Sequence, residues 1–193
     1  MRIIAGSLRS RALVAPAGLD TRPTSDRLRE TLFNVLAPRI EGAVFLDLYA
    51  GSGAVGIEAL SRGASRVTFV ERAPAALTVL RANLAKLGLT EGFRVQSGSV
   101  KAFLQRIKPD QAFQFDLVFL DPPYDSEKEY AGTLGLLGGE ASGSLAPGAT
   151  VIAEHRRKEK LGDNYGLLAR TRLLEQGDAA LSFYAVNPVD HQE

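Results

Sequence analysis

Apolar residues along most of the chain fall into short continuous runs that alternate with stretches of helical spacing. The runs predict β-strands at residues 44–48, 66–70, 93–96, 115–120 and 149–153, and the stretches between them predict helices at 54–62, 74–87, 100–107 and 127–138. Regular alternation of this kind is typical of βαβ units, because two parallel strands need a crossover connection between them. The pattern therefore predicts an α/β fold with a mostly parallel sheet.

The start of the chain follows a different pattern. Residues 2–4 and 12–14 are short apolar runs separated by a Gly-Ser pair, and they predict a small hairpin. A helix is expected to reach Leu36, with Thr24 or Ser25 as its N-cap. We therefore expect a hairpin plus a helix to form an N-terminal extension.

The end of the chain departs from the alternation too. Two apolar runs, residues 165–174 and 180–186, are joined by a polar segment that contains glycine, and they predict a closing antiparallel hairpin. The chain then divides into the extension, residues 1–38, and a main domain, residues 39–193.

Composition excludes several classes of protein. A length of 193 residues, with 45% apolar and 23% charged residues, is typical of one globular domain with at most a small appendage. No stretch approaches the roughly 18 to 20 consecutive apolar residues of a membrane span, and we expect a cytoplasmic protein. The chain has no cysteine and only two, widely separated, histidines, so we expect no metal centre.

Charge is distributed unevenly along the chain. The formal net charge is only +1, but residues 1–39 hold seven arginines and three acidic residues, a net charge of +4. Residues 40–153 carry a net charge of −2. Arginine presents a planar fork that suits phosphate and stacks on bases. The start of the chain is therefore either a phosphate-binding arm or a solvated basic surface.

A glycine motif directly follows the first predicted strand. Gly51, Gly53 and Gly56 have G-x-G-x-x-G spacing, which lets backbone approach a ligand closely and lets the helix pack on the strand. A phosphate-binding P-loop needs Lys and then Ser or Thr after the last glycine, where this chain has Ile57-Glu58. A nucleophile elbow needs G-x-S-x-G, but Ala50 takes the place of its first glycine, two residues before Ser52. Both motifs are therefore excluded. The motif indicates either a plain turn or a site for a nucleotide-like cofactor held without a phosphate cradle.

Acidic residues end the first two predicted strands. Asp47 lies four residues before Gly51, where a carboxylate would repel a pyrophosphate but suits an α-amino group or a sulfonium. Glu71 ends the second strand, where an acid accepts hydrogen bonds from both hydroxyls of a ribose. The alternative for Glu71 is a structural ion pair with Arg72 or Arg66.

The fourth strand runs into Asp121-Pro122-Pro123-Tyr124. Two prolines end a parallel strand because neither can donate to the ladder, but a turn alone does not explain an acid and an aromatic at the strand end where ligands bind in such sheets. The Asp121 carboxylate and the Pro122 carbonyl can accept the two hydrogens of an exocyclic base amine, while Tyr124 stacks on the extruded base. The motif therefore predicts chemistry on an amine.

Taken in order, these motifs carry a resemblance. Asp47 to Gly56, Glu71 and Asp121 to Tyr124 resemble motifs I, II and IV of the S-adenosylmethionine-dependent amino-methyltransferases. Residues 2–6, 21–34 and 177–184 resemble, more narrowly, the bacterial family that methylates N2 of one guanine in 16S ribosomal RNA, the small-subunit methyltransferase D type that acts on guanine 966. The resemblance spans almost the whole chain.

The resemblance implies a Rossmann-like class I methyltransferase, with a seven-stranded sheet whose last strand is reversed and an N-terminal extension that contacts RNA. It implies S-adenosylmethionine as cofactor and 16S rRNA, in the small ribosomal subunit or its assembly intermediate, as partner. We expect a monomer with no membrane partner. Where related enzymes often carry Asp or Asn for the adenine amine, this chain has Ser99, whose hydroxyl is expected to take that place.

The expected site residues form three groups. The catalytic group is Asp121, Pro122 and Tyr124. The cofactor-binding group is Asp47, Gly51, Gly53, Glu71, Arg72, Ser99, Val100 and Asp121. The RNA-binding group is Arg2, Arg9, Arg11, Arg22, Thr24, Ser25, Arg27 and Arg29.

Three other functions stay open on the sequence. Two of them are an N6-adenine DNA or RNA methyltransferase and a glutamine side-chain methyltransferase. Both fit the same motif, because Asp or Asn followed by two prolines and an aromatic residue suits amines and amides alike. A non-catalytic module that binds the cofactor and assists RNA assembly is the third. A dehydrogenase is disfavoured, because Asp47 opposes a pyrophosphate.

Overall fold

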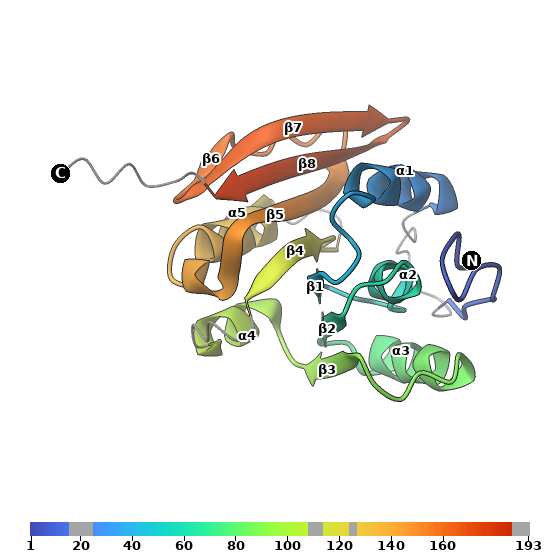
Figure 1. The fold of residues 1–193 in the computed structure, drawn as a ribbon. Helices are drawn as coiled ribbons and strands as arrows, with labels where there is room; N and C mark the ends of the chain where they lie inside the picture. The colour runs from blue at the N-terminus through green and yellow to red at the C-terminus, as the bar shows by residue number, and fades with distance from the viewer. Residues whose placement is uncertain (16–24, 108–113, 124–126, 187–193) are drawn as a thin grey trace.

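Strands and helices alternate along the chain as the sequence predicts, in the computed structural model that we describe (Figure 1). The structure describes residues 1–15, 25–107, 114–123 and 127–186. The helices are α1 (Asp26–Leu36), α2 (Ala54–Ser61), α3 (Pro74–Lys86), α4 (Val100–Arg106), α5 (Glu127–Leu137) and the 3-10 helix η2 (Ser142–Ser144). The strands are β1 (Val44–Leu48), β2 (Arg66–Glu71), β3 (Phe93–Ser97), β4 (Phe115–Leu120), β5 (Leu145–Arg156), β6 (Asn164–Tyr165), β7 (Leu168–Gln176) and β8 (Ala179–Val186).

Eight strands of the described residues form one sheet, in the order β3-β2-β1-β4-β5-β8-β7-β6. The strands from β3 to β5 are parallel, and β8 runs antiparallel to both β5 and β7. This confirms the predicted Rossmann-like sheet with its reversed last strand. The sheet has eight strands and not seven because two residues, β6, pair with the start of β7.

Strand β5 is longer than the pattern predicts. It begins at Leu145, ahead of the expected 149, and its register against β4 shifts between Phe115, which pairs with Leu145, and Leu117, which pairs with Thr150. Gly148 lies at this irregularity with a φ of +74°. Proline and glycine interrupt the apolar run here, so the sequence pattern detects only the part of the strand that follows them.

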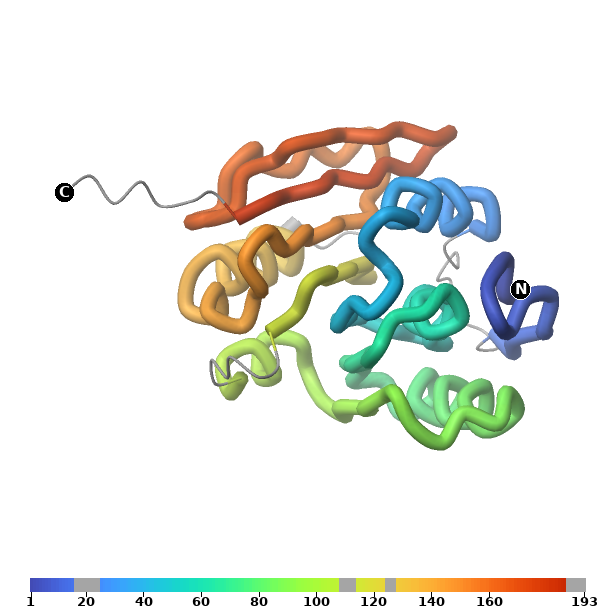
Figure 2. The backbone as a smooth tube through the Cα atoms, in the orientation of Figure 1, coloured from blue at the N-terminus to red at the C-terminus, as the bar shows by residue number. Residues whose placement is uncertain are grey.

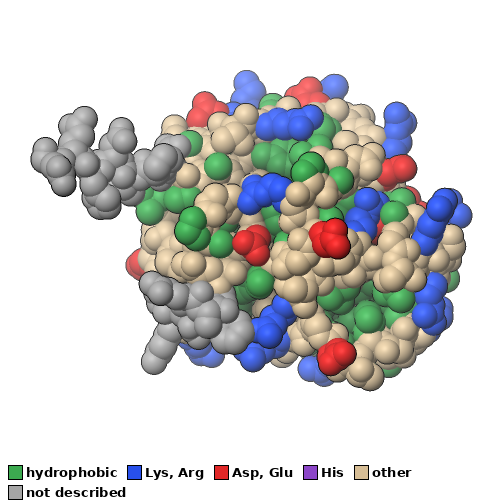
Figure 3. Space-filling view, viewed as in Figure 1, with side chains coloured by type: hydrophobic (Ala, Val, Ile, Leu, Met, Phe, Trp, Pro, Cys, Tyr) green, Lys and Arg blue, Asp and Glu red, His purple; other side chains and the backbone are tan. Residues whose placement is uncertain are grey.

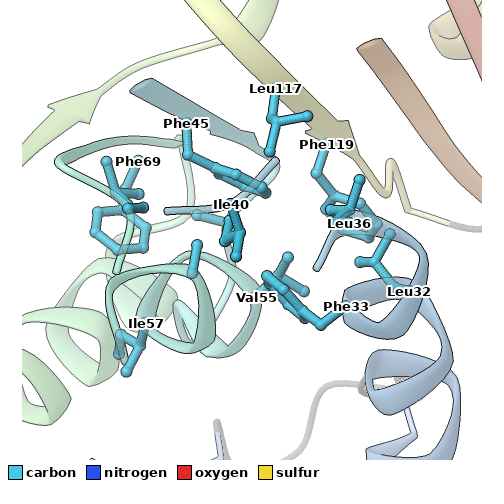
Figure 4. Packing of buried hydrophobic residues seen from close by; sticks show 14 of the residues in the cluster. Leu32, Phe33, Leu36, Ile40, Phe45, Val55, Ile57, Phe69, Leu117 and Phe119 are labelled. Carbon is cyan, nitrogen blue, oxygen red and sulfur yellow. The ribbon is translucent and has the colours of Figure 1, made fainter. Parts of the chain in front are cut away.

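Alternation along the central strands sends successive side chains to two faces of the sheet. Phe45, Phe69, Leu117 and Phe119 pack with α1, α2 and α3, and Figure 4 shows these four side chains together with Phe33 of α1 and Ile57 of α2. Leu46, Leu48, Val70, Val118 and Leu120 pack with α4 and α5 on the other face. The helices thus form two layers around one sheet (Figure 1).

The N-terminal segment packs on the first of these faces. Ile3 and Leu13 are buried in the same cluster as α1 and the sheet. The two arms of the predicted hairpin pair without forming regular strands: Arg2 bridges Ala12, and the N–H groups of Ile3 and Leu13 donate to the carbonyls of Arg11 and Met1 at 3.0 and 3.1 Å. The segment lies beside α2 (Figure 2). There the fully buried Glu58 accepts backbone N–H bonds from Ile4 at 2.8 Å and Ala5 at 3.0 Å. The extension therefore shares its core with the main domain.

In the part of the chain that the structure describes, no helix combines the length and apolar character that crossing a membrane requires. Nor do His, Cys, Asp or Glu gather there in threes as a metal site would need.

Gly56→Ala is expected to destabilise the protein by about 1 to 3 kcal/mol, because a Cβ there would lie 2.3 Å from a ring atom of Phe69 and 2.8 Å from Val67. Gly135→Ala is the matched control in α5, where a Cβ meets nothing within 4 Å. That variant should gain about 0.5 to 1 kcal/mol from helix propensity. Urea unfolding measures both, and a Gly56→Ala protein as stable as the parent would refute the close approach of α2 to β2.

Candidate active site

A cavity of about 890 Å³ opens at the carboxyl ends of β1, β2 and β4. Its volume falls in the range of about 300 to 1,000 Å³ usual for ligand sites. The cavity lies at the switch point of the sheet, because β2 flanks β1 on one side and β4 flanks it on the other. Its walls include most of the predicted cofactor and catalytic residues: Asp47, Gly51, Glu71, Arg72, Ser99, Val100, Asp121 and Pro122.

The loop from β1 to α2 forms the floor of this cavity. Gly51 has a φ of +56° and Gly53 a φ of +80°, values that glycine adopts without a steric cost. Gly53 is the N-cap of α2 and does not line the cavity; a Cβ there would lie 2.3 Å from Leu80. Gly51 thus faces the space that a ligand would fill, whereas Gly53 serves the packing of the loop on α3.

Asp47 is almost fully buried at the end of β1, with 2% of its surface exposed. Its carboxylate accepts a hydrogen bond from the Gly56 N–H at 2.9 Å. Burial raises the pKa of Asp47 to about 7, a rise that the Gly56 bond opposes and the nearby Glu71 charge supports. A cation that entered the cavity would favour the ionised form of this acid.

Glu71 holds the loops around the cavity through backbone groups. One carboxylate oxygen accepts the Gly51 N–H at 2.8 Å, and the other accepts the N–H groups of Arg72 and Ala73 at 2.7 Å each. The main chain of Arg72, not its guanidinium, is therefore the partner of Glu71, and the Arg72 side chain lies exposed at the mouth of the cavity. Since a carboxylate offers about four acceptor positions, Glu71 keeps one for a ligand hydroxyl.

Asp121 and Pro122 reach the same cavity from the end of β4. Burial raises the pKa of Asp121 well above its ordinary value, and the charges of Glu154 and Asp47 add to the rise. Pro122 is buried and Pro123 is exposed. Tyr124, the third expected catalytic residue, lies outside the described residues.

Ser99 and Val100 line the cavity at the start of α4. Ser99 is the N-cap of this helix, and its Oγ accepts the Ala102 N–H at 3.2 Å. The Ser99 hydroxyl is thus engaged in capping, with part of its hydrogen-bonding capacity left for a ligand. Its expected contact with an adenine amine stays a prediction.

Two residues of the site were missed by the sequence analysis. Tyr49 lines the cavity with a φ of +61°, rare for a tyrosine, and its hydroxyl bonds Glu129 at 2.9 Å and Thr133 at 2.7 Å on α5. Asn83 is fully buried on α3, where its amide donates to the carbonyl of Ser52 at 3.0 Å. No local sequence signal marks either residue, because each depends on a partner distant along the chain.

Asn83 also holds the N-terminal segment. Its Nδ2 donates to the Val14 carbonyl at 3.0 Å and its Oδ1 accepts the Val14 N–H at 2.8 Å. One amide side chain therefore joins the loop on the cavity floor to the segment that precedes residues 16–24.

The expected RNA-binding arginines differ in exposure and in contacts. Arg2, Arg9 and Arg27 are exposed. Arg11, also exposed, donates to the carbonyls of Lys86 and Leu87 at 3.3 Å each, at the end of α3. Arg22 and Thr24 lie outside the described residues.

Ser25 and Arg29 have structural roles in α1. Ser25 is the N-cap, accepting the Leu28 N–H at 3.1 Å. The structure corrects the expected RNA-binding role of Arg29. This side chain is fully buried, donates to the Arg2 carbonyl and to Asp26, and lies 3.7 Å from the Glu58 carboxylate. Because no phosphate can reach it in this fold, we remove Arg29 from the RNA-binding group.

Asp47→Asn is expected to stabilise the unliganded protein more at pH 8 than at pH 5. In the folded protein Asp47 keeps its proton up to about pH 7, whereas the unfolded chain releases it near pH 4. Folding stability from this group is therefore lost as pH rises between these values. Asparagine does not titrate and still accepts the Gly56 N–H. Thermal unfolding should show a gain several degrees larger at pH 8; an equal gain at both pH values would contradict the raised pKa.

Comparison with known proteins identifies the family. The sequence matches the family described as Conserved hypothetical protein 95 over residues 1–185. It is 38% identical over 185 residues to YlbH of Bacillus subtilis, provisionally named an rRNA methyltransferase, which covers 95% of this chain and 98% of that protein. It is 42% identical over 154 residues to the ribosomal RNA small subunit methyltransferase D of Escherichia coli, which covers 80% of this chain and 74% of that protein.

Among solved structures, the Escherichia coli protein yhhF, provisionally named a methyltransferase, superposes with a TM-score of 0.83 at 35% identity. That match covers 97% of this chain and 98% of the other. The resemblance drawn from the motifs is thereby confirmed. The chain belongs to the family described as Conserved hypothetical protein 95 and has the Rossmann-like fold of the class I methyltransferases.

Proposed function

We propose that this protein transfers a methyl group from S-adenosylmethionine to the exocyclic N2 of one guanine, of the position-966 type, in 16S rRNA of the small ribosomal subunit. The observation that carries the proposal is that a single cavity is lined by Asp47, Glu71, Asp121 and Pro122. These residues come from the ends of β1, β2 and β4, so the cofactor and the target base, bound together in this cavity, can contact all of them. The names of the curated relatives support rRNA as the substrate class. The protein is proposed to act as a cytoplasmic monomer.

One end of the cavity suits the cofactor. Asp47, ionised by a cationic neighbour, accepts the α-amino group, and the acceptor position that Glu71 keeps takes a ribose hydroxyl. Gly51 lets the backbone approach closely, and Ser99, Val100 and the exposed Arg72 complete the proposed binding group. When bound, S-adenosylmethionine supplies a methyl group made electrophilic by its sulfonium.

The other end suits an amine. The Asp121 carboxylate and the Pro122 carbonyl accept the two hydrogens of the guanine N2, which turns the nitrogen lone pair toward the methyl carbon. The new N–C bond forms as the C–S bond breaks, and the bonding pair stays on sulfur as a neutral thioether. Alignment of this kind can supply about 7 to 11 kcal/mol. Orientation is therefore the main work of these residues.

The methylated nitrogen must then lose one proton. Asp121 touches this nitrogen and has a pKa raised well above the ordinary value, because it is buried beside Glu154 and Asp47. It can hold the proton until water removes it. Asp121 thus serves as hydrogen-bond acceptor first and as proton acceptor afterwards.

The N-terminal extension is proposed to hold the RNA. Arg2, Arg9 and Arg27 are exposed there, and Arg11 keeps further donors beyond its bonds to α3. Arg22, Thr24 and Tyr124 remain in the proposed set on the sequence alone. Asn83 ties this extension to the cavity floor, and this contact supports a role for the extension in holding RNA near the proposed cofactor site.

Methyl transfer from labelled S-adenosylmethionine tests the function directly. The substrates are small subunits and free 16S rRNA from a strain that lacks the corresponding enzyme, and digestion to nucleosides identifies the product. N2-methylguanosine at a single position supports the proposal. N6-methyladenosine, methylglutamine on protein, or cofactor binding without transfer would each assign one of the alternative functions.

Asp121→Ala is expected to lower the methyl-transfer rate by about 100-fold or more, because it removes the acceptor that orients the amine. Asp121→Asn is the matched variant, since it keeps one acceptor oxygen of the same shape, and should keep more of the rate. Filter binding with rRNA should show a near-parental affinity for both variants. Equal rates for the alanine and asparagine variants would contradict the orienting role.

Arg9→Ala/Arg27→Ala is expected to weaken rRNA binding and to reduce the slope of log affinity against log salt by about 0.7 for each lost single-strand phosphate contact. The matched control is Arg157→Ala/Lys158→Ala, which removes two exposed charges that do not belong to the extension. Equal losses in the two proteins would assign Arg9 and Arg27 to a solvated basic surface.

A further inference from the structure

A second, smaller cavity adjoins the proposed cofactor site. It has a volume of about 320 Å³ and lies between α4 and β3; we call it the α4–β3 cleft. Gly98 and Ser99 line both this cleft and the larger cavity, so the two spaces share a wall at the same edge of the sheet. The residues that matter for its chemistry are Arg94, Gln96, Ser97, Ser99, Phe103 and Arg106.

The cleft follows from the edge position of β3 and from where α4 packs. Phe93 and Val95 face the core on the α2 and α3 side, so alternation sends Arg94 and Gln96 to the opposite face. Helix α4 covers that face only in part, because it packs chiefly against α5 and β2. Arg94 and Gln96 of β3 therefore lie beside α4, but this helix does not cover them.

Helix α4 presents different chemistry to the two cavities. Lys101 and Gln105, one turn apart, face the larger cavity, whereas Ala102 and Arg106, also one turn apart, face the cleft. Arg106 thereby joins Arg94 across the cleft, and both side chains are exposed. Figure 3 shows basic side chains between α4 and β3 on this side of the molecule.

The two cavities differ in the charges that line them. Within the described residues, the cleft lining contains two arginines and no acid, and neither arginine forms an ion pair or a side-chain hydrogen bond. The larger cavity is lined by four acids, Asp47, Glu71, Asp121 and Glu129, and by three bases, Arg72, Lys101 and Lys128. A phosphate therefore meets only positive charge in the cleft lining, but charges of both signs in the larger cavity.

We propose that the α4–β3 cleft binds a backbone phosphate, with its nucleotide, of the RNA strand whose target base enters the larger cavity. The proposal rests on the function proposed above. Two guanidinium groups facing one space suit the two free oxygens of a phosphodiester, Gln96 and Ser97 add hydrogen-bonding groups, and Phe103 gives an aromatic wall for a base.

This assignment places RNA contacts on both faces of the sheet. The N-terminal extension lies beside α2, and the α4–β3 cleft belongs to the α4 face (Figures 1 and 2). The mouth of the larger cavity lies between them. An RNA strand held at both places would cross that mouth, which fixes the target base over Asp121.

The test is Arg94→Gln/Arg106→Gln, compared with Arg81→Gln/Arg157→Gln. Each pair removes two exposed arginines and changes the net charge equally, but Arg81 and Arg157 do not line the cleft. Filter binding with a 16S rRNA fragment across a salt series gives affinity and salt slope. Calorimetry gives the S-adenosylmethionine affinity, and methyl transfer at saturating RNA gives kcat.

The cleft variant is expected to bind RNA about 10- to 100-fold more weakly, with a salt slope lower by about 0.7 to 0.9 per lost phosphate contact. Its cofactor affinity and kcat should match the parent, because only KM for RNA depends on the cleft. Arg94→Lys/Arg106→Lys should keep most of the salt slope.

The proposal would be overturned by parental RNA affinity in the cleft variant, or by an equal loss in the control pair. Tighter binding of free guanosine monophosphate than of the RNA fragment would overturn it in favour of a free nucleotide site. The proposed function is tested separately, with the parent protein. Parent protein that binds rRNA without transferring methyl would refute the enzyme assignment, while loss of RNA affinity confined to the cleft variant would still support the cleft.

Discussion

Two buried carboxylates hold the loop between β1 and α2, and their hydrogen bonds to backbone N–H groups decide where the rest of the site can lie. Asp47 accepts from Gly56 in the first turn of α2, just after the loop, and Glu71 accepts from Gly51 within the loop. Asn83 adds a third bond, to the carbonyl of Ser52. Since the polar groups of the loop are satisfied by the protein itself, its positive-φ glycines hold their conformation before any ligand binds.

Two acids of the site, Asp47 and Asp121, make the unliganded protein less stable than it could be. Both have raised pKa values, chiefly because burial disfavours their charged forms, and neighbouring charges add to the rise: Glu71 for Asp47, and Glu154 and Asp47 for Asp121. A chain under selection for stability alone would place asparagine or an apolar residue at these positions. Their presence is explained if a cationic ligand occupies the cavity, because its charge offsets the mutual repulsion of the acids.

The sequence predicted those features of the fold and site that depend on local patterns. Strands, helices and the acids at strand ends follow from periodicity and from the rule that parallel strands end at one edge. Arg29 shows where such reasoning fails: it belongs to an arginine-rich segment, yet it lies next to Leu28 on the buried side of α1 and meets Glu58 from a distant helix. The sequence analysis missed Tyr49 and the α4–β3 cleft for the same reason, since both depend on packing between elements far apart along the chain.

The separation of charge around the site has a consequence for how RNA can be recognised. A nucleotide combines an anionic phosphate with an uncharged base, and in the larger cavity the acids Asp47 and Glu71 are buried whereas the bases Arg72, Lys101 and Lys128 are exposed. Further basic side chains lie outside this cavity, on the N-terminal extension and at Arg94 and Arg106. These charges favour the phosphate at the exposed rim and the uncharged base inside. Extrusion of the base from its stack is then favoured by the electrostatics of the site as well as by the reach of the methyl donor.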